Sequence, residues 1–262
     1  MRRERAPIWI AILAAIGAAF FVVPLIGLVV KTPWGDALQS LTSTDTLEAL
    51  KLSLIASLSA TAVSLVLGVP LAWIYARIDF PGRTVLRALT TLPMVLPPVV
   101  GGIALFLAFG RRGLVGSLLD TTFGITLPFT TAGVVFAETF VAMPFLVLTV
   151  EAGLRSMDRR YEDAARTLGA RRWTVFTRVT LPLIAPSLVA GAVLCWARAL
   201  GEFGATITFA GNFPGVTQTM PLAVYLLLES NHPEGSFILS LLLLLVSLAV
   251  LVGLRHRWLG SA

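Results

Sequence analysis

The chain has 262 residues, of which 56% are hydrophobic and only 13% are charged, whereas a soluble domain is about one quarter charged. Its formal net charge is +6, and its mean hydropathy is +0.87. This composition excludes an ordinary soluble domain and indicates an integral membrane protein. The basic residues are scattered between long apolar runs, which argues against a nucleic-acid-binding protein.

Few residues are available for catalysis or for metal binding. Cys195 is the only cysteine, and His232 and His256 are the only histidines. These three residues cannot form an intrachain disulfide or a zinc cluster, so we expect no metal and no cofactor. No Ser/His/Asp or Cys/His set is visible either, which makes an integral membrane enzyme the least favoured interpretation.

Six apolar segments meet or nearly meet the length of a spanning helix, which is about 20 residues for a hydrocarbon core roughly 30 Å thick. An open strand would leave backbone groups unpaired in lipid, so helices are expected. The sequence therefore predicts an all-α membrane protein with one transmembrane domain, 1–262. Its spans are expected at about 8–30, 52–75, 89–109, 131–150, 187–210 and 237–254.

Arg2, Arg3 and Arg5 precede the first span and resemble the basic start of a secretory signal peptide. The apolar core of a signal peptide is usually about 7 to 15 residues long, and this segment is longer. We therefore expect a retained first helix, which places both termini on the same side of the membrane.

The distribution of basic residues indicates which side this is, because positively charged short loops stay in the cytoplasm. Arg198 lies within a span, and only Lys31, Lys51, Arg111 and Arg112 fall on the side opposite the termini. We expect cytoplasmic termini in a bacterial inner membrane. The basic residues on the side of the termini are Arg2, Arg3, Arg5, Arg77, Arg83, Arg87, Arg155, Arg159, Arg160, Arg166, Arg171, Arg172, Arg178, Arg255 and Arg257.

Several spans contain residues that disturb a helix. Pro70 and Pro144 each lie in one span, and the third span contains Pro93, Pro97, Pro98, Gly101 and Gly102. Such prolines remove backbone donors, and they are either tolerated kinks or bends that line a path. The apolar run 221–228 has eight residues, which is too short to cross, and we expect it at the outer surface.

The longest charged loop, 155–183, separates the fourth and fifth spans. Asp158 is a suitable N-cap and Gly169 a suitable stop, so the loop is expected to contain one short helix followed by a second over 171–179. The small pair Ala164-Ala165 would allow close contact with another surface. The alternative is an amphipathic helix resting on lipid headgroups.

This loop resembles the inner loop of ABC importer permeases, whose pattern is Glu-Ala-Ala, three residues, Gly, nine residues, Ile, any residue, Leu-Pro. Asp replaces Glu and Val replaces Ile here, and either Glu162 or Asp163 could be the functional acid. The resemblance implies a coupling helix that docks into a separate cytoplasmic ATPase. The coupling residues are Glu162, Asp163, Ala164, Ala165, Gly169, Val179, Leu181 and Pro182.

The same resemblance implies the remaining partners. The chain has no Gly-x-x-x-x-Gly-Lys-Ser/Thr loop, so ATP hydrolysis is expected from the partner rather than from this chain. Two ATPase subunits act as a pair, which calls for a second copy of the permease. An extracytoplasmic oxyanion-binding protein would deliver the substrate, and lipid would surround the spans.

A narrower resemblance, to bacterial molybdate permeases, covers most of the chain. Sulfate and thiosulfate permeases share the stretch that begins at Arg198 and ends at Glu202, and tungstate is a further alternative. The resemblance therefore implies an oxyanion importer, with molybdate as the leading substrate. The similar stretches are 110–113, 123–126, 164–170 and 197–209.

Charged residues inside the spans are costly and usually face the bundle interior or a wet cavity. Arg198 and Glu202 lie four residues apart and can pair on one helical face, either as a structural pin or as part of a gate. Glu138 is a weaker candidate for the path, because a carboxylate repels a dianion, and the favoured interpretation is a hydrogen-bonded or ion-paired structural group. If no ATPase were involved, these three residues would form the relay of an ion-coupled secondary transporter.

Overall fold

The computed structural model describes residues 7–230 and 233–258, and every regular element in these ranges is helical. The prediction of an all-α chain is thereby confirmed. Arg2, Arg3, Arg5 and His232 lie outside the described residues.

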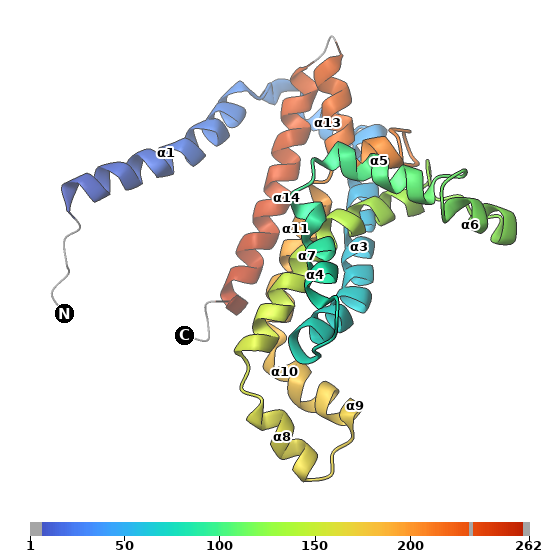
Figure 1. Ribbon diagram of the computed structural model, residues 1–262. Helices are drawn as coiled ribbons and strands as arrows, with labels where there is room; N and C mark the ends of the chain where they lie inside the picture. Colours follow the sequence, from blue (N-terminus) through green and yellow to red (C-terminus); the bar gives the residue numbers. More distant parts are fainter. Residues whose placement is uncertain (1–6, 231–232, 259–262) are drawn as a thin grey trace.

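Three helices form the centre of the molecule: α3 (Thr44–Arg77), α7 (Thr131–Ser156) and α11 (Ala185–Leu200) (Figure 1). Alanines line much of their shared core, and small side chains let membrane helices approach closely. Helix α14 (Glu234–Trp258) runs beside this core and packs against the short helix α13 (Met220–Glu229). Helix α1 (Ile8–Lys31) points away from the bundle and buries none of its residues (Figure 1).

Within the described residues, α1, α3 and α7 are each long and apolar enough to cross a bilayer. Two bent helix pairs would raise this number to five if each pair is one span. Helix α3 begins eight residues before the expected span, because the Ser43 side chain caps it by accepting a hydrogen bond from the backbone nitrogen of Thr46. Pro70 and Pro144 lie inside α3 and α7 without ending either helix.

The expected third span, 89–109, is not one straight helix. It consists of α4 (Arg83–Thr91), the 3-10 turn η2 (Leu92–Met94) and α5 (Pro98–Phe109), with a bend of 119°. Pro97 and Pro98 explain the break, because proline lacks an amide donor and disfavours the helical conformation of the residue before it.

The expected fifth span, 187–210, is also interrupted. Helix α11 ends at Leu200, residues 201–203 are not helical, and α12 (Gly204–Phe209) follows. Before α11, the segment Arg172–Leu183 contains α9 (Arg172–Val175), the π-helical turn η3 (Phe176–Thr180) and α10 (Leu181–Leu183). This segment meets α11 at 73°.

The two broken segments pack against each other through α5 and α12. A Cβ atom on Gly102 would lie 1.6 Å from Thr208 Oγ1, and one on Gly204 would lie 2.7 Å from Pro98 Cβ. Glycine is therefore required at both positions for this approach. The remaining helices are η1 (Trp34–Asp36), α2 (Ala37–Thr42), α6 (Gly116–Phe123) and α8 (Arg160–Thr167).

Candidate functional site

The predicted helix in the charged loop is α8. Its C-terminal end is the expected one, whereas Arg159 rather than Asp158 occupies the N-cap position. Asp158 Oδ1 accepts a hydrogen bond of 2.9 Å from the backbone nitrogen of Arg160 at the start of the helix. Gly169 follows the last turn with φ at +81°, a conformation that glycine adopts without strain. Gly169 thus marks the end of the helix as expected, and the N-cap lies one residue after Asp158.

Glu162 ties α8 to two other parts of the chain. Its Oε1 accepts a hydrogen bond of 2.7 Å from Thr180 Oγ1 in η3, and its Oε2 lies 3.2 Å from Arg77 Nε at the end of α3. The side chains of Arg77 and Glu162 are only 7% and 4% exposed. Removing one partner of such a pair leaves a buried charge without compensation. We call these three residues the Glu162 clasp.

Asp163, the acid that the spacing aligns with the family pattern, points to solvent. Its contacts are an ion pair of 3.4 Å with Arg166 and a hydrogen bond from Thr167 to its backbone oxygen. The two acids therefore differ in their surroundings: Glu162 is buried in contacts within the chain, and Asp163 is exposed and paired only with Arg166 of its own helix. Of the other predicted coupling residues, Ala164, Gly169 and Pro182 are exposed, and Ala165, Val179 and Leu181 are half-buried.

Two arginines of the loop fasten it to the end of α3. Arg159 Nη2 donates to the carbonyl oxygen of Ala76 at 3.0 Å, and Arg155 Nη2 donates to that of Tyr75 at 3.4 Å. The last carbonyls of a helix lack helical partners and carry partial negative charge, so arginine is well suited there. The loop and α3 are therefore connected by both the clasp and these caps.

The buried Glu151 of α7 was missed in the sequence analysis. Its carboxylate lies 2.8 Å from Arg155 Nη2 and 3.0 Å from Arg87 Nε of α4. The signal was present, because Glu151 precedes Arg155 by four residues at the end of an apolar helix. Arg77 carried no such signal, because its partner Glu162 is 85 residues away.

The loop exposes large apolar side chains to solvent. Leu168 at the tip is 88% exposed, Trp173 is 73% exposed, and Tyr161 is also exposed. The Trp173 ring lies 5.9 Å from that of Phe176, which holds it on the second half of the loop. Exposed apolar groups surrounded by arginines are typical of a surface that another protein covers.

Arg198 and Glu202 form the expected pair, with Nη2 and Oε2 2.6 Å apart. The other carboxylate oxygen of Glu202 accepts a hydrogen bond of 2.8 Å from the backbone nitrogen of Ala205 in the first turn of α12. Glu202 is buried and Arg198 is partly exposed. The pair therefore bridges the break between α11 and α12.

Glu138 of α7 is buried, and its Oε2 has no hydrogen-bond partner among the described residues. Helix α7, which carries Glu138, packs against α12. The structure thus pairs Arg198 with Glu202 and places Glu138, the third ionisable group that the sequence put inside the spans, on the neighbouring helix α7. Within the described ranges, no group of three His, Cys, Asp or Glu side chains could hold a metal ion.

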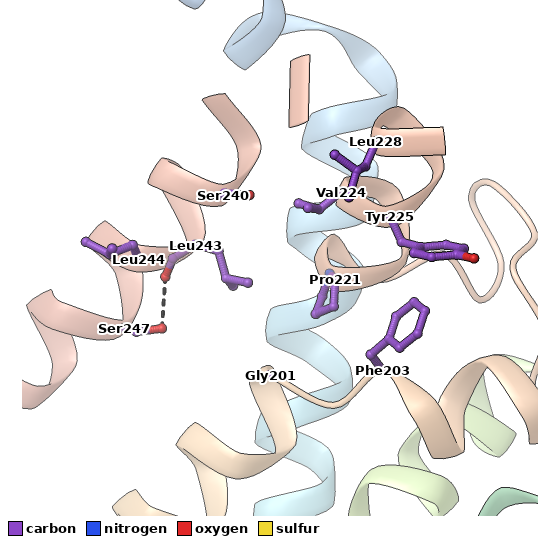
Figure 2. Close-up of a pocket in the computed structure, with 10 residues that line it drawn as sticks. All are labelled: Gly201, Phe203, Pro221, Val224, Tyr225, Leu228, Ser240, Leu243, Leu244 and Ser247. Atoms are coloured by element: carbon purple, nitrogen blue, oxygen red, sulfur yellow. Dashed lines mark hydrogen bonds between the residues drawn. The ribbon is translucent and has the colours of Figure 1, made fainter. Parts of the chain in front are cut away.

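A cavity of about 510 Å³ lies between α13, α14 and the break after α11 (Figure 2). Its lining is mostly apolar, and Ser247 Oγ donates to the Leu243 carbonyl of its own helix at 2.8 Å rather than to the cavity. This lining offers a tetrahedral dianion few donors in exchange for its hydration. The lining residues are Gly201, Phe203, Pro221, Val224, Tyr225, Leu228, Ser240, Leu243, Leu244 and Ser247.

Comparison with solved structures supports the same architecture. The chain is similar to a bacterial ABC transporter involved in the import of the acidic polysaccharide alginate, with a TM-score of 0.74 and 20% identity, over 97% of this chain and 96% of that one. It also resembles the MetNI methionine ABC transporter, with a TM-score of 0.58 and 20% identity, over 82% of this chain and 97% of that one. These likenesses establish the fold.

Similarity to curated sequences is higher. The molybdenum transport system permease protein ModB of Mycobacterium tuberculosis is 46% identical over 96% of this chain and 94% of its own length. ModB of Escherichia coli is 44% identical over 81% and 93%, and the sulfate transport system permease protein CysT of Escherichia coli is 38% identical over 85% and 81%. Residues 64–259 match the model of one family, so the chain is a multi-pass membrane protein that belongs to the binding-protein-dependent transport system inner membrane components.

Proposed function

We propose that this chain is the membrane-spanning permease subunit of an ATP-driven ABC importer that carries molybdate into the cell. The observation that carries the substrate assignment is the 46% identity to a molybdenum permease over 96% of the chain. The chain forms the passage, and a separate ATPase hydrolyses ATP.

The proposed topology has six spans and two cytoplasmic termini. Five spans correspond to α1, α3, the bent α4–α5 segment, α7 and α11, and α14 supplies the sixth. The loop 155–183, with its many arginines, then lies in the cytoplasm, as short basic loops do. The chain is one transmembrane domain in this proposal.

The coupling function is supported by how the loop is attached. Leu168 and Trp173 are exposed for an ATPase cleft, whereas Glu162 is buried against Arg77. A push on α8 would therefore reach α3 through a desolvated ion pair and through the two arginine caps on the α3 carbonyls. Packed elements move as rigid bodies in such transitions. Two copies of the loop would meet two ATPase subunits.

Dimerisation is supported by α1. This 24-residue helix buries no side chain, although Phe20 and Phe21 stand well exposed on it. In a single chain it would face lipid on all sides, whereas a two-fold homodimer offers it a second surface. The passage would run between the two copies.

The broken helices are the proposed gate. Helices α5 and α12 both begin at a break and pack closely, and the pair Arg198–Glu202 bridges the break before α12. Interrupted helices at membrane depth are tolerated where they line a cavity or are buried in protein. Arg198 and Glu202 would fix the position of α12 during alternating access, and Glu138 would lie on the neighbouring α7.

Sulfate is the second candidate substrate, because CysT of Escherichia coli is 38% identical over most of this chain. Tungstate resembles molybdate in shape and charge and would follow the same route. An extracytoplasmic binding protein would select among these oxyanions before delivery.

The test is uptake of labelled molybdate into proteoliposomes that contain the chain, its ATPase and its binding protein. ATP-dependent uptake that excess sulfate does not reduce is the expected result. Reduction by sulfate would move the assignment to a sulfate permease. Uptake that follows an ion gradient without ATP would instead establish a secondary transporter.

A further inference from the structure

A second, polar pocket of about 300 Å³ lies where the turn after α3 meets α4 and the end of α7. Three of its six lining side chains are arginines. The lining residues are Asp79, Phe80, Arg83, Thr84, Arg87 and Arg155.

The arginines of this pocket outnumber the carboxylates that pair with them. Arg83 pairs with Asp79, whose side chain is 95% exposed, and Arg87 and Arg155 share the single carboxylate of Glu151. Glu151 contacts Arg87 through Nε, and the Nη atoms of Arg87 bond to no other described residue. The pocket therefore holds one surplus positive charge and unused guanidinium donors.

The helix that carries two of these arginines is amphipathic. Val85, Leu86 and Leu89 are exposed on one face of α4, and Arg83 and Arg87 lie on the opposite face. Helix α4 begins the proposed third span at its cytoplasmic end, where Arg83 and Arg87 reach the level of the headgroups. Its apolar face would then enter the acyl region, and its arginines would stay at the level of lipid phosphates.

We propose that this pocket binds a tetrahedral phosphate-type oxyanion, which in the membrane is the headgroup of an anionic phospholipid. A guanidinium fork matches phosphate geometry, and an anionic headgroup neutralises the surplus charge without bringing a cation of its own. The proposal rests on the membrane topology proposed above and is independent of the transported substrate. A free oxyanion in the cytoplasm offers the same chemistry.

The test compares the purified full-length chain in detergent with added phosphatidylglycerol, phosphatidylcholine, potassium phosphate or potassium molybdate, at constant ionic strength. The unfolding temperature is measured as a function of ligand concentration, since a ligand that binds only the folded state raises it. Arg83→Gln is the informative variant, because its partner Asp79 is exposed and no buried charge is left alone. Arg112→Gln is the control, as it removes the same charge from an exposed turn outside the pocket.

Phosphatidylglycerol is expected to raise the unfolding temperature more than phosphatidylcholine does, and Arg83→Gln should weaken its apparent affinity roughly tenfold, whereas Arg112→Gln should not. If phosphate or molybdate produces the Arg83-dependent shift instead, the site takes a soluble oxyanion. Equal shifts with both lipids and no effect of either salt, or equal shifts in Arg83→Gln and the unmodified chain, would overturn the proposal. Molybdate uptake by the reconstituted importer in phosphatidylcholine vesicles tests the transport function separately.

Discussion

Arg77 Nε and Glu162 Oε2 lie 3.2 Å apart in a place where both side chains are shielded from water. The two residues are 85 positions apart in the chain, one at the end of α3 and one in α8. Their pairing, together with the hydrogen bond from Thr180 to Glu162, connects the loop directly to the end of α3. The acidic neighbour Asp163 has no part in it, so the two acids can be separated experimentally.

Glu162→Gln is expected to destabilise the loop far more than Asp163→Asn, its matched control. The first change leaves the Arg77 guanidinium buried without a counter-charge, which costs on the order of 3 to 5 kcal/mol when a buried pair is broken. The second removes only an exposed pair, worth less than about 1 kcal/mol. Thermal unfolding of the purified chain measures the first effect.

The same pair of variants should separate coupling from ATP hydrolysis. In the reconstituted importer, Glu162→Gln is expected to lower molybdate uptake per ATP hydrolysed, because the push on α8 no longer reaches α3. Uptake and hydrolysis are measured on the same vesicles. An unchanged ratio in Glu162→Gln, with a loss in Asp163→Asn, would contradict the role given to the clasp and assign coupling to the exposed acid.

Gly169→Ala is expected to destabilise the tip of the loop, since alanine at φ +81° costs about 1 kcal/mol or more. Gly169→Asn should be tolerated better, because asparagine adopts this conformation more readily. Limited proteolysis at the arginines after Gly169 provides the measurement, with faster cleavage expected in the alanine variant. Equal cleavage rates in both variants would show that the turn does not depend on this conformation.

Glu202→Ala is expected to reduce transport and stability more than Glu202→Gln. Glutamine keeps an oxygen that can accept the bond from the Ala205 nitrogen and loses only the ion pair with Arg198, whereas alanine loses both. Loss of a helix N-terminal cap alone costs roughly 0.5 to 2 kcal/mol. Thermal unfolding and uptake are compared for the two variants, and equal losses would show that the ion pair, rather than the cap, holds α12.

Local signals in the sequence predicted the C-terminal end of α8 correctly, because Gly169 acts within one turn of the helix, but the N-cap is Arg159 rather than the expected Asp158. The pairing of Arg198 with Glu202 was predictable for the same reason, since helical spacing of four residues brings them together. The sequence did not predict which of the two adjacent acids in α8 is buried. Glu162 and Asp163 are adjacent and chemically alike, and only the distant Arg77 makes one of them the buried partner.

The sequence predicted the third and fifth spans without the angles of their breaks. Hydropathy over 89–109 and 187–210 measures only whether the residues prefer lipid. It does not report the direction of the helix axis. The prolines at 97 and 98 were visible, but many membrane helices absorb proline, as α3 does with Pro70 and α7 with Pro144. The third span differs from α3 and α7 because it has two prolines in succession, so two neighbouring backbone N–H donors are missing.

Gly102→Ala is expected to disrupt the contact between α5 and α12 and to abolish most molybdate uptake. The new Cβ atom would lie 1.6 Å from Thr208 Oγ1 and 2.9 Å from the backbone oxygen of Ala205, so the two helices must move apart. Gly101→Ala is the matched control, because its Cβ atom would meet only the Phe140 ring, at 3.3 Å, and a side chain can shift.

Thr208→Ala should restore part of the uptake in the Gly102→Ala background, since it removes the closest contact but leaves the Ala205 oxygen in place. Full rescue would mean that the hydroxyl alone sets the helix spacing. Unimpaired uptake by the single Gly102→Ala variant would contradict the close approach of α5 and α12, and with it the proposal that these two broken helices form the gate.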